Sequence, residues 1–304
     1  MSYIKNDLID AVHPAGKVFY HYKTEKKIIS ELTEYQKISI VDLEVYGRAL
    51  FLDDELQSAK IDEHIYHETL VHPAFLNYKH LLNNYGAKSI NVLILGAGEG
   101  AAIRETLKYQ NVKKIIAVDI DRKVINFSKK YLPTFHQESF NDPRVELVFD
   151  DAVEFLKRRD RKFQIIICDL VNYNVGKNNE VAENLYSKEF FQNLSRCLSD
   201  EGILSIQAHY LTEVCYETHY LIKKRVAKYF NRCLSYRVYV PSSLIMQAFL
   251  LCKKSDKNNS DFHFPYDIAP REPRAKFLQK LNLRFLDIDT YGTLFKFPPI
   301  LKNR

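Results

Sequence analysis

The chain of 304 residues has no run of about 18 apolar residues, the length that a membrane-spanning helix needs. Its first residues also lack the apolar core of a secretory signal peptide. Internal repeats and low-complexity tracts are absent as well. From these absences the sequence predicts a cytoplasmic protein with no membrane span.

Cysteine is scarce. The chain has five cysteines, an odd number, and none of them forms a Cys-x-x-Cys pair. Most lie in apolar stretches, which favours reduced, buried thiols over disulfides or a zinc site. No cluster of His, Cys and Asp has the spacing of metal ligands, so we predict no metal.

Basic residues exceed acidic ones, and the net charge is +6. The densest basic cluster, residues 157–162, ends a predicted helix, where cations complement the helix dipole and remain solvated. The other basic pairs are scattered along the chain. The sequence therefore predicts no nucleic-acid partner.

Two domains are expected from the length, and 46% apolar with 27% charged residues is typical of a globular protein. Residues 36–43, 46–54 and 56–60 are short strands separated by turns, which indicate a small antiparallel sheet. A helical pattern follows over residues 62–78. We predict an amino-terminal β-strand domain over residues 1–75 and a catalytic domain over residues 76–304.

From residue 89 onward strands and helices alternate, which favours a mostly parallel sheet. The fold class predicted is α/β, with a Rossmann-like, methyltransferase-type, mostly parallel sheet and a small amino-terminal antiparallel β domain. The expected strands are 91–95, 114–119, 145–151, 163–169 and 202–207, with 234–240 and 246–252 as an antiparallel edge. The expected helices are 101–109, 121–132, 152–158, 187–198, 213–230 and 273–283.

Glycine is also rare, yet three of the nine glycines, Gly96, Gly98 and Gly100, fall within five positions. They follow an apolar strand and precede a helical pattern. Glycine is needed where φ is positive or where a ligand lies against the backbone. At the end of a parallel strand this pattern is typical of a nucleotide-binding turn.

Acidic residues follow the next three strands. Asp119 ends the second strand 23 residues after Gly96, about the separation at which an acid binds ribose hydroxyls in Rossmann-type sites. Asp151 and Asp169 follow the third and fourth strands, where carboxylates line the crevice in which open α/β sheets bind ligands. The simpler alternative, above all for Asp151, is that these residues only cap helices.

Several ordered motifs then resemble one family, the polyamine aminopropyltransferases, which include spermidine and thermospermine synthases. The resemblance covers residues 35–298. Its motifs are Tyr35-Gln36, Gly47-Arg-Ala-Leu-Phe-Leu-Asp-Asp, Gln57-Ser-Ala-Lys-Ile-Asp-Glu-His-Ile-Tyr-His-Glu68, Gly96-Ala-Gly-Glu-Gly100, Arg104-Glu105, Val118-Asp-Ile-Asp121, Asn141-Asp-Pro-Arg144, Asp150-Asp151, Asp169 and Gln207. The Gly-Glu-Gly sequence and the Val240-Pro-Ser242 turn resemble thermospermine synthases most.

The resemblance implies an enzyme that transfers an aminopropyl group from decarboxylated S-adenosylmethionine to a polyamine (spermidine to thermospermine, or putrescine to spermidine), releasing methylthioadenosine. It implies a co-substrate but no prosthetic group, and a homodimer or homotetramer. The catalytic residues that it implies are Asp169, as proton acceptor, and Tyr66. The donor-binding residues that it implies are Gln36, Gly96, Gly98, Glu99, Gly100, Asp119, Asp151 and Ala152. The acceptor-binding residues are His67, Glu99, Asn172 and Gln207.

Elementary chemistry supports these assignments. The decarboxylated donor has an ammonium but no carboxylate, so Glu99 inside the glycine turn would attract it and repel ordinary S-adenosylmethionine. The acceptor amine must be neutral to attack, and with a pKa of about 10.4 its neutralisation at pH 7 costs roughly 4–5 kcal/mol. A base such as Asp169 must therefore take its proton.

One position departs from the family pattern. A second acid usually follows the fourth strand, and here it is Asn172, which removes a charge from the acceptor site. Two alternatives therefore stay open: a methyltransferase that uses S-adenosylmethionine, or a non-catalytic paralogue that binds polyamine or nucleoside. An NAD enzyme would leave Asp151 and Asp169 unexplained.

Overall fold

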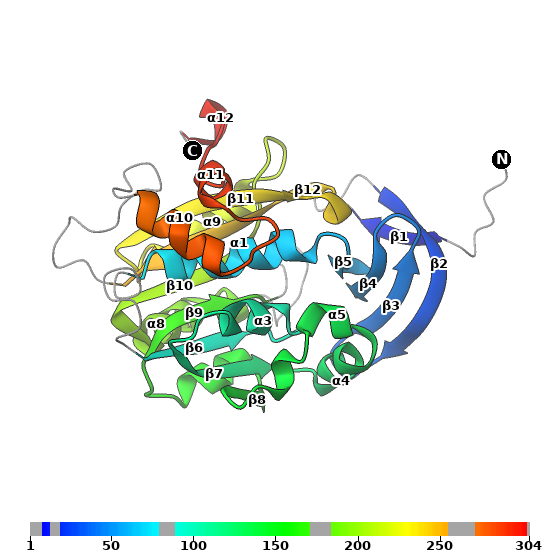
Figure 1. The fold of residues 1–304 in the computed structure, drawn as a ribbon, viewed down its shortest axis with the longest axis horizontal. Coiled ribbons are helices and arrows are strands. Elements are labelled where there is room, and N and C mark those ends of the chain that lie inside the picture. The colour runs from blue at the N-terminus through cyan, green and yellow to red at the C-terminus, as the bar shows by residue number, and fades with distance from the viewer. Residues whose placement is uncertain (1–7, 13–18, 79–88, 171–183, 255–270, 303–304) are drawn as a thin grey trace.

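The chain folds into two β-sheets that lie side by side with helices around the larger one (Figure 1). The computed structural model describes residues 8–12, 19–78, 89–170, 184–254 and 271–302. The smaller sheet is antiparallel, in the order β1-β2-β3-β4-β5. Its strands are Leu8–Val12, Phe19–Leu32, Lys37–Leu43, Gly47–Leu52 and Glu55–Ala59.

The larger sheet has seven strands in the order β11-β12-β10-β9-β6-β7-β8. Five of them are parallel: β6 (Ile90–Leu95), β7 (Val112–Asp119), β8 (Val145–Phe149), β9 (Phe163–Cys168) and β10 (Leu198–Tyr210). The antiparallel edge consists of β11 (Arg232–Val240) and β12 (Ile245–Lys253). The predicted fold class, including this edge, is confirmed.

The helices are α1 (Glu63–Leu76), α3 (Ala101–Leu107), α4 (Arg122–Tyr131), α5 (Pro133–His136), α6 (Ala152–Lys157), α8 (Lys188–Cys197), α9 (Glu217–Val226), α10 (Arg271–Lys280), α11 (Ile288–Thr293) and α12 (Pro299–Lys302). The described residues also form two single 3₁₀ turns, η2 (Ser139–Asn141) and η3 (Pro241–Ser243). Within the described residues no helix is long and apolar enough to cross a membrane.

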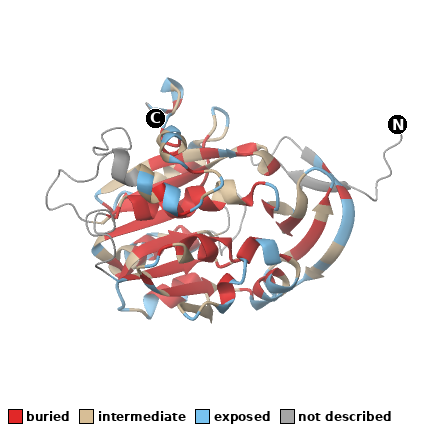
Figure 2. Cartoon of the chain, in the orientation of Figure 1, coloured by how far each residue is buried: buried red, intermediate tan, exposed pale blue. Residues whose placement is uncertain are grey.

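Helices cover both faces of the larger sheet, and β6 shows how the sequence separates the two faces. Ile90, Val92 and Ile94 point to the core beneath α1, α3 and α11, whereas Leu93 and Leu95 point to the core beneath α6, α8 and α9. This alternation is the two-residue period of a strand. Because both faces are apolar and covered, every residue of β6 except Asn91 is buried, as is usual for central parallel strands. Figure 2 shows the strands at the centre of the larger sheet as mostly buried.

The smaller sheet differs from its prediction, because it has five strands and not three. β1 and β2 were not predicted from the sequence. In β2, of the side chains described, only Tyr22 and Thr24 are buried, and the exposed ones are mostly polar, so no apolar alternation marks the strand. The boundary predicted at residue 75 stays a prediction; α1, which ends beside it, packs with the larger sheet.

A buried contact joins the two sheets. The Asp62 carboxylate, just before α1, accepts hydrogen bonds from the backbone N–H and hydroxyl of Ser242 at 2.6 and 2.9 Å. From the smaller sheet, the Tyr22 hydroxyl donates to the Ser242 carbonyl at 2.6 Å. The β11–β12 turn is thereby fixed against the smaller sheet, and the space between the sheets has a defined shape.

Candidate active site

A cavity of about 270 Å³ lies where the carboxyl ends of the parallel strands face the smaller sheet. Acids at the carboxyl ends of β6, β7, β8 and β9 line it. They come together because these parallel strands end at the same edge of the larger sheet. Its lining from the larger sheet and the segments packed around it is Tyr66, His67, Gly96, Gly98, Glu99, Val118, Asp119, Ile120, Val124, Asp150, Asp151, Ala152, Asp169, Leu170, Leu185, Gln207, Tyr210 and Gln247. The smaller sheet and its loops supply Tyr35, Gln36, Leu50, Leu52, Asp53, Leu56 and Gln57.

Glycine is required where β6 meets the end of β9. Gly96 has φ +85°, and a Cβ atom there would lie 1.9 Å from the Asp169 carbonyl oxygen. The residue thus allows two strand ends to touch and brings the glycine turn against Asp169. Gly100 also has positive φ, but a side chain there would strike the Phe140 ring, and Gly100 is not part of the cavity lining. Packing explains Gly100 without a ligand, so its donor-binding role stays a prediction.

Asp119 holds the glycine turn in place. Its Oδ2 accepts hydrogen bonds from the backbone N–H groups of Ala97 (3.0 Å) and Gly98 (2.9 Å), and its Oδ1 accepts one from Asp121 N–H (2.9 Å). Burial raises the pKa of this carboxyl, although the three backbone donors oppose the effect. Asp119 therefore shapes the turn and lines the cavity at the same time.

Asp169 and Tyr66 form a short polar contact in the lining. The Tyr66 hydroxyl, on α1, donates to Asp169 Oδ1 at 2.5 Å. Burial raises the pKa of Asp169 to about 6, helped by the nearby charges of Glu99 and Asp119 and opposed by His67 and Tyr66. Asp169 is therefore mostly ionised at pH 7 yet far more basic than an ordinary aspartate, which suits a proton acceptor.

His67 and Glu99 lie in contact with each other in the cavity lining. His67 Nε2 lies 3.3 Å from Glu99 Oε1, and His67 Nδ1 lies 3.1 Å from Glu63 Oε2 and 2.7 Å from the Glu63 carbonyl oxygen. Burial alone would lower the pKa of His67, but the two carboxylates reverse this and raise it well above its usual value. The His67 cation in turn overcomes the effect of burial on Glu99, whose pKa falls to about 2.

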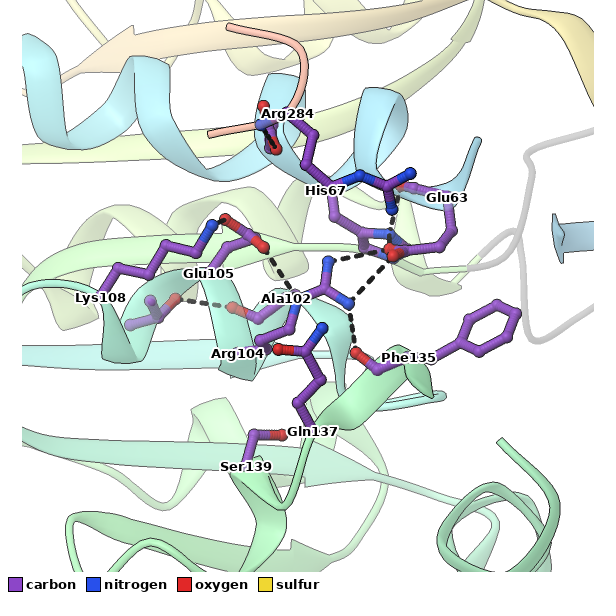
Figure 3. A network of polar contacts seen from close by, with 12 residues as sticks. Glu63, His67, Ala102, Arg104, Glu105, Lys108, Phe135, Gln137, Ser139 and Arg284 are labelled. Atoms are coloured by element: carbon purple, nitrogen blue, oxygen red, sulfur yellow. Dashed lines mark hydrogen bonds and ion pairs between the residues drawn. The ribbon is translucent and has the colours of Figure 1, made fainter. Parts of the chain in front are cut away.

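Behind this pair lies a buried ion network (Figure 3). Arg104, on α3, binds both carboxylate oxygens of Glu63, with Nη1–Oε1 at 3.0 Å and Nη2–Oε2 at 2.9 Å. Its Nε donates to Glu105 at 2.8 Å, and Glu105 also contacts His72 at 2.9 Å. Arg104 further donates to the Phe135 carbonyl. The network links α1, α3 and α5 behind the cavity.

The smaller sheet contributes Gln36, whose side-chain amide donates to Asp121 Oδ2 at 3.3 Å. The Thr33 hydroxyl binds the same oxygen at 2.7 Å. Asp121 caps α4 and so ties the smaller sheet to the end of β7. Asp151 caps α6 through Oδ1, as its simpler alternative predicted, and it also lines the cavity beside Ala152.

The structure thus brings together most residues that the sequence singled out. Those that line the cavity are Gln36, Tyr66, His67, Gly96, Gly98, Glu99, Asp119, Asp151, Ala152, Asp169 and Gln207. Asn172 lies outside the described residues. Within the part of the chain that is described, no three His, Cys, Asp or Glu side chains are grouped to hold a metal ion.

Two sets of residues at or behind the cavity were not predicted from the sequence. Glu63 and Arg104 received no role, although Glu63 and His67 are four positions apart and so share one face of a helix. Tyr210 and Gln247 line the cavity from β10 and β12. Their positions depend on how an antiparallel edge strand pairs, which no local spacing indicates.

Comparisons with known proteins agree with this geometry. A family profile described as "Spermine/spermidine synthase domain" matches residues 63–263, and one described as "Spermidine synthase tetramerisation domain" matches residues 11–68. A polyamine aminopropyltransferase of Pyrobaculum aerophilum is 35% identical over 95% of this chain and 94% of its own. One from Sulfurisphaera tokodaii is 34% identical over 94% of this chain and 89% of its own.

Solved structures give the same answer. A spermidine synthase crystallised with the transition-state analogue AdoDATO superposes with a TM-score of 0.80 at 25% identity, covering 98% of this chain and 94% of that one. The spermidine synthase of Thermotoga maritima has the same fold, with a TM-score of 0.78 at 24% identity and coverage of 98% and 93%. The resemblance seen in the sequence motifs is confirmed: the chain belongs to the spermine/spermidine synthase family.

Proposed function

We propose that this protein transfers the aminopropyl group of decarboxylated S-adenosylmethionine to a polyamine acceptor and releases methylthioadenosine. The observation that carries the proposal is the Asp169–Tyr66 pair, an ionised, unusually basic carboxylate at the end of β9 facing a cavity rimmed by acids. Full-length relatives named polyamine aminopropyltransferase support the same reaction.

In this mechanism Asp169 takes the proton of the attacking amine. The Tyr66 hydroxyl occupies Oδ1, which leaves Oδ2 for the substrate N–H. As the proton leaves, the nitrogen attacks the carbon beside the sulfonium, the carbon–sulfur bond breaks, and sulfur departs as a neutral thioether. Removal of the amine from water in the cavity lowers its pKa and narrows the gap to that of Asp169. Alignment of nitrogen, carbon and sulfur supplies the remaining rate.

Charge selects the donor. Glu99, Asp119 and Asp169 surround the glycine turn, so a carboxylate on the donor would be repelled and an ammonium attracted. Decarboxylated S-adenosylmethionine meets this requirement, and ordinary S-adenosylmethionine does not. The methyltransferase alternative therefore has the wrong electrostatics as well as the wrong family.

The remaining roles follow the position of each side chain in the cavity. We assign the nucleoside to Gln36, Asp119, Asp151 and Ala152, beside the glycine turn, and the amines to His67, Glu99 and Gln207, with Asn172 as a further acceptor contact predicted from the sequence. Putrescine and spermidine are both candidate acceptors, the latter giving thermospermine. The likeness to thermospermine synthases in the Gly-Glu-Gly sequence stays a prediction.

We also propose that the chain forms a homo-oligomer, a dimer or a tetramer. The match of residues 11–68 to a tetramerisation domain supports this, as do Leu32, Val45 and Ile61, large apolar side chains that the smaller sheet and its loops leave exposed. The cytoplasmic location predicted from the sequence stays a prediction.

The direct test incubates the protein with decarboxylated S-adenosylmethionine and, one at a time, putrescine, spermidine and longer amines. Mass spectrometry should detect methylthioadenosine together with an acceptor that is heavier by one aminopropyl group. Release of no methylthioadenosine with any amine would contradict the proposal. Tighter binding of ordinary S-adenosylmethionine than of the decarboxylated donor, measured by calorimetry, would favour a methyltransferase.

A further inference from the structure

The charges behind the cavity alternate in sign. Glu99 contacts His67. His67 contacts Glu63, both terminal nitrogens of the Arg104 guanidinium bind Glu63, and Arg104 also contacts Glu105 (Figure 3). Only the first two, Glu99 and His67, line the cavity. Glu63 is 5% exposed and Arg104 8%, so both are held by the protein and not by solvent.

His67 connects the cavity to the buried charges behind it. Its Nδ1 is fixed by Glu63 on the same helix, while its Nε2 points at Glu99 in the glycine turn. Other titratable groups near it are Tyr66, with ring centroids 5.2 Å apart, and Asp169 at the end of β9. The Arg284 side chain also lies beside Glu63 and His67 (Figure 3). With a carboxylate at each ring nitrogen, the imidazole is held with both nitrogens protonated.

Arg104 fixes the orientation of the Glu63 carboxylate. Its paired N–H groups bind both oxygens of Glu63 in the fork geometry that only arginine offers. Bound in this way, Glu63 cannot rotate away from the imidazole. The position of the positive charge on His67 is thus set by two residues that lie outside the cavity.

We propose that Glu63 and Arg104 are positioning residues that hold His67 as a cation against Glu99, so that a cationic substrate tail must displace a proton from His67 to bind Glu99. The inference rests on the proposed function, because it assumes a substrate ammonium in this cavity. An imidazolium and an ammonium cannot share one buried carboxylate without repulsion. The proton goes to solvent, and Glu99 then pairs with the substrate. Glu99 is therefore never left as a bare buried charge.

The first measurement needs no substrate. In NMR titrations of the full chain, with the His67 ring signal assigned by its loss in His67→Gln, the wild-type ring should remain protonated at pH 7. Glu63→Gln removes one of its two carboxylates, and the titration midpoint should fall by about one to three pH units. If Glu63→Gln fails to fold, Glu63→Asp keeps the charge but shortens the reach, and the midpoint should fall by less.

Glu105→Gln is the matched control, since Glu105 is as buried and also binds Arg104 but does not contact His67. It should leave the His67 midpoint close to that of the wild type. A midpoint unchanged by Glu63→Gln or Glu63→Asp, or moved equally by Glu105→Gln, would overturn the inference.

The second measurement is calorimetry in two buffers with different ionisation enthalpies at pH 7. Binding of decarboxylated S-adenosylmethionine should release protons, whereas methylthioadenosine, which lacks the ammonium, should not. The release should fall in Glu63→Gln by the fraction of His67 that the titration of this variant finds already neutral at pH 7. Equal release with both ligands would also overturn the inference. If instead the wild type formed no methylthioadenosine with any amine, the proposed function would fail while the substrate-free titration still tested Glu63.

Discussion

The two walls of the cavity differ in charge. The wall built on the larger sheet carries Glu99, Asp119, Asp169 and His67, joined to one another or to the backbone by short contacts. The wall from the smaller sheet and its loops is mostly neutral. Its lining side chains are Leu50, Leu52, Leu56, Gln36, Gln57, Tyr35 and one exposed acid, Asp53.

This difference in charge suggests that the charged wall carries the reacting groups and the neutral wall encloses them. Charged groups need rigid, buried supports to keep shifted pKa values, and parallel strand ends backed by the Glu63–Arg104 pair provide them. In the proposed mechanism the neutral wall keeps water from the reacting groups, and its Gln36 contributes to the binding of the nucleoside. Substitutions on the charged wall should therefore change turnover and selectivity, and those on the neutral wall should change affinity.

The largest effect should come from Asp169→Asn. Without the proton acceptor, methylthioadenosine release should fall by about 10²–10⁴-fold, while donor binding measured by calorimetry stays largely intact.

Asp169→Asn should also stabilise the fold. Because the pKa of Asp169 is raised from 3.8 to about 6 in the folded protein, the folded state loses stability as the pH rises through that range. Removing the charge should therefore raise the free energy of unfolding at pH 7, measured in urea, by roughly 3 kcal/mol.

The matching change on the neutral wall is Asp53→Asn. Asp53 also lines the cavity, but it is exposed, and its carboxylate accepts a hydrogen bond from the Lys37 backbone N–H at 2.8 Å. Turnover should change by less than about twofold, because an exposed amide can accept the same bond. Equal losses in the two variants would mean that the two walls do not differ in function.

Next in size is Glu99→Gln, which keeps the shape and the contact with His67 but removes the charge. The preference for decarboxylated over ordinary S-adenosylmethionine should fall by about 10- to 100-fold, the value of a hydrogen bond to a charged group. The measurement is the ratio of the two dissociation constants by calorimetry. An unchanged ratio would show that another acid selects the donor.

Much of the charged wall could be predicted from the sequence because parallel strands end at the same edge of a sheet. Gly96, Asp119 and Asp169 follow three such strands, so their convergence required only that the strands be recognised. The family motifs then added His67 and Tyr66. The sequence could not give the protonation states of these groups. The charge of His67 depends on its contacts with Glu99 and Glu63, and Glu63 is bound by Arg104 from another helix.

The neutral wall was harder to predict for a different reason. Most of β2 is polar and exposed, so its strand has no apolar signature. The larger sheet has an irregularity of its own. In β10 a register shift between Gln207 and Tyr210, with His209 at φ +68°, accompanies the presence of both side chains in the lining, although simple alternation would place them on opposite faces. Irregular backbone of this kind leaves no periodic signal.

The pH profile should show the charged wall directly. Below pH 6 Asp169 gains a proton and cannot accept one, so kcat/KM should fall about tenfold per pH unit, in addition to the fall from protonation of the acceptor amine. In Asp53→Asn, kcat/KM should show the same fall below pH 6. A wild-type profile that follows the amine alone from pH 5 to pH 8 would mean that Asp169 is not the base.

The smallest effect should come from the neutral wall. Gln36→Ala removes one hydrogen bond to Asp121, while Thr33 still binds the same oxygen at 2.7 Å. KM for the donor should rise by about two- to tenfold with kcat unchanged, the pattern expected when a binding contact of about 0.5–1.5 kcal/mol is lost equally from ground and transition states. Gln57→Ala, an exposed residue of the same wall, serves as control and should change KM less. A large fall in kcat for Gln36→Ala would place part of the chemistry on the smaller sheet, and the division between the two walls would not hold.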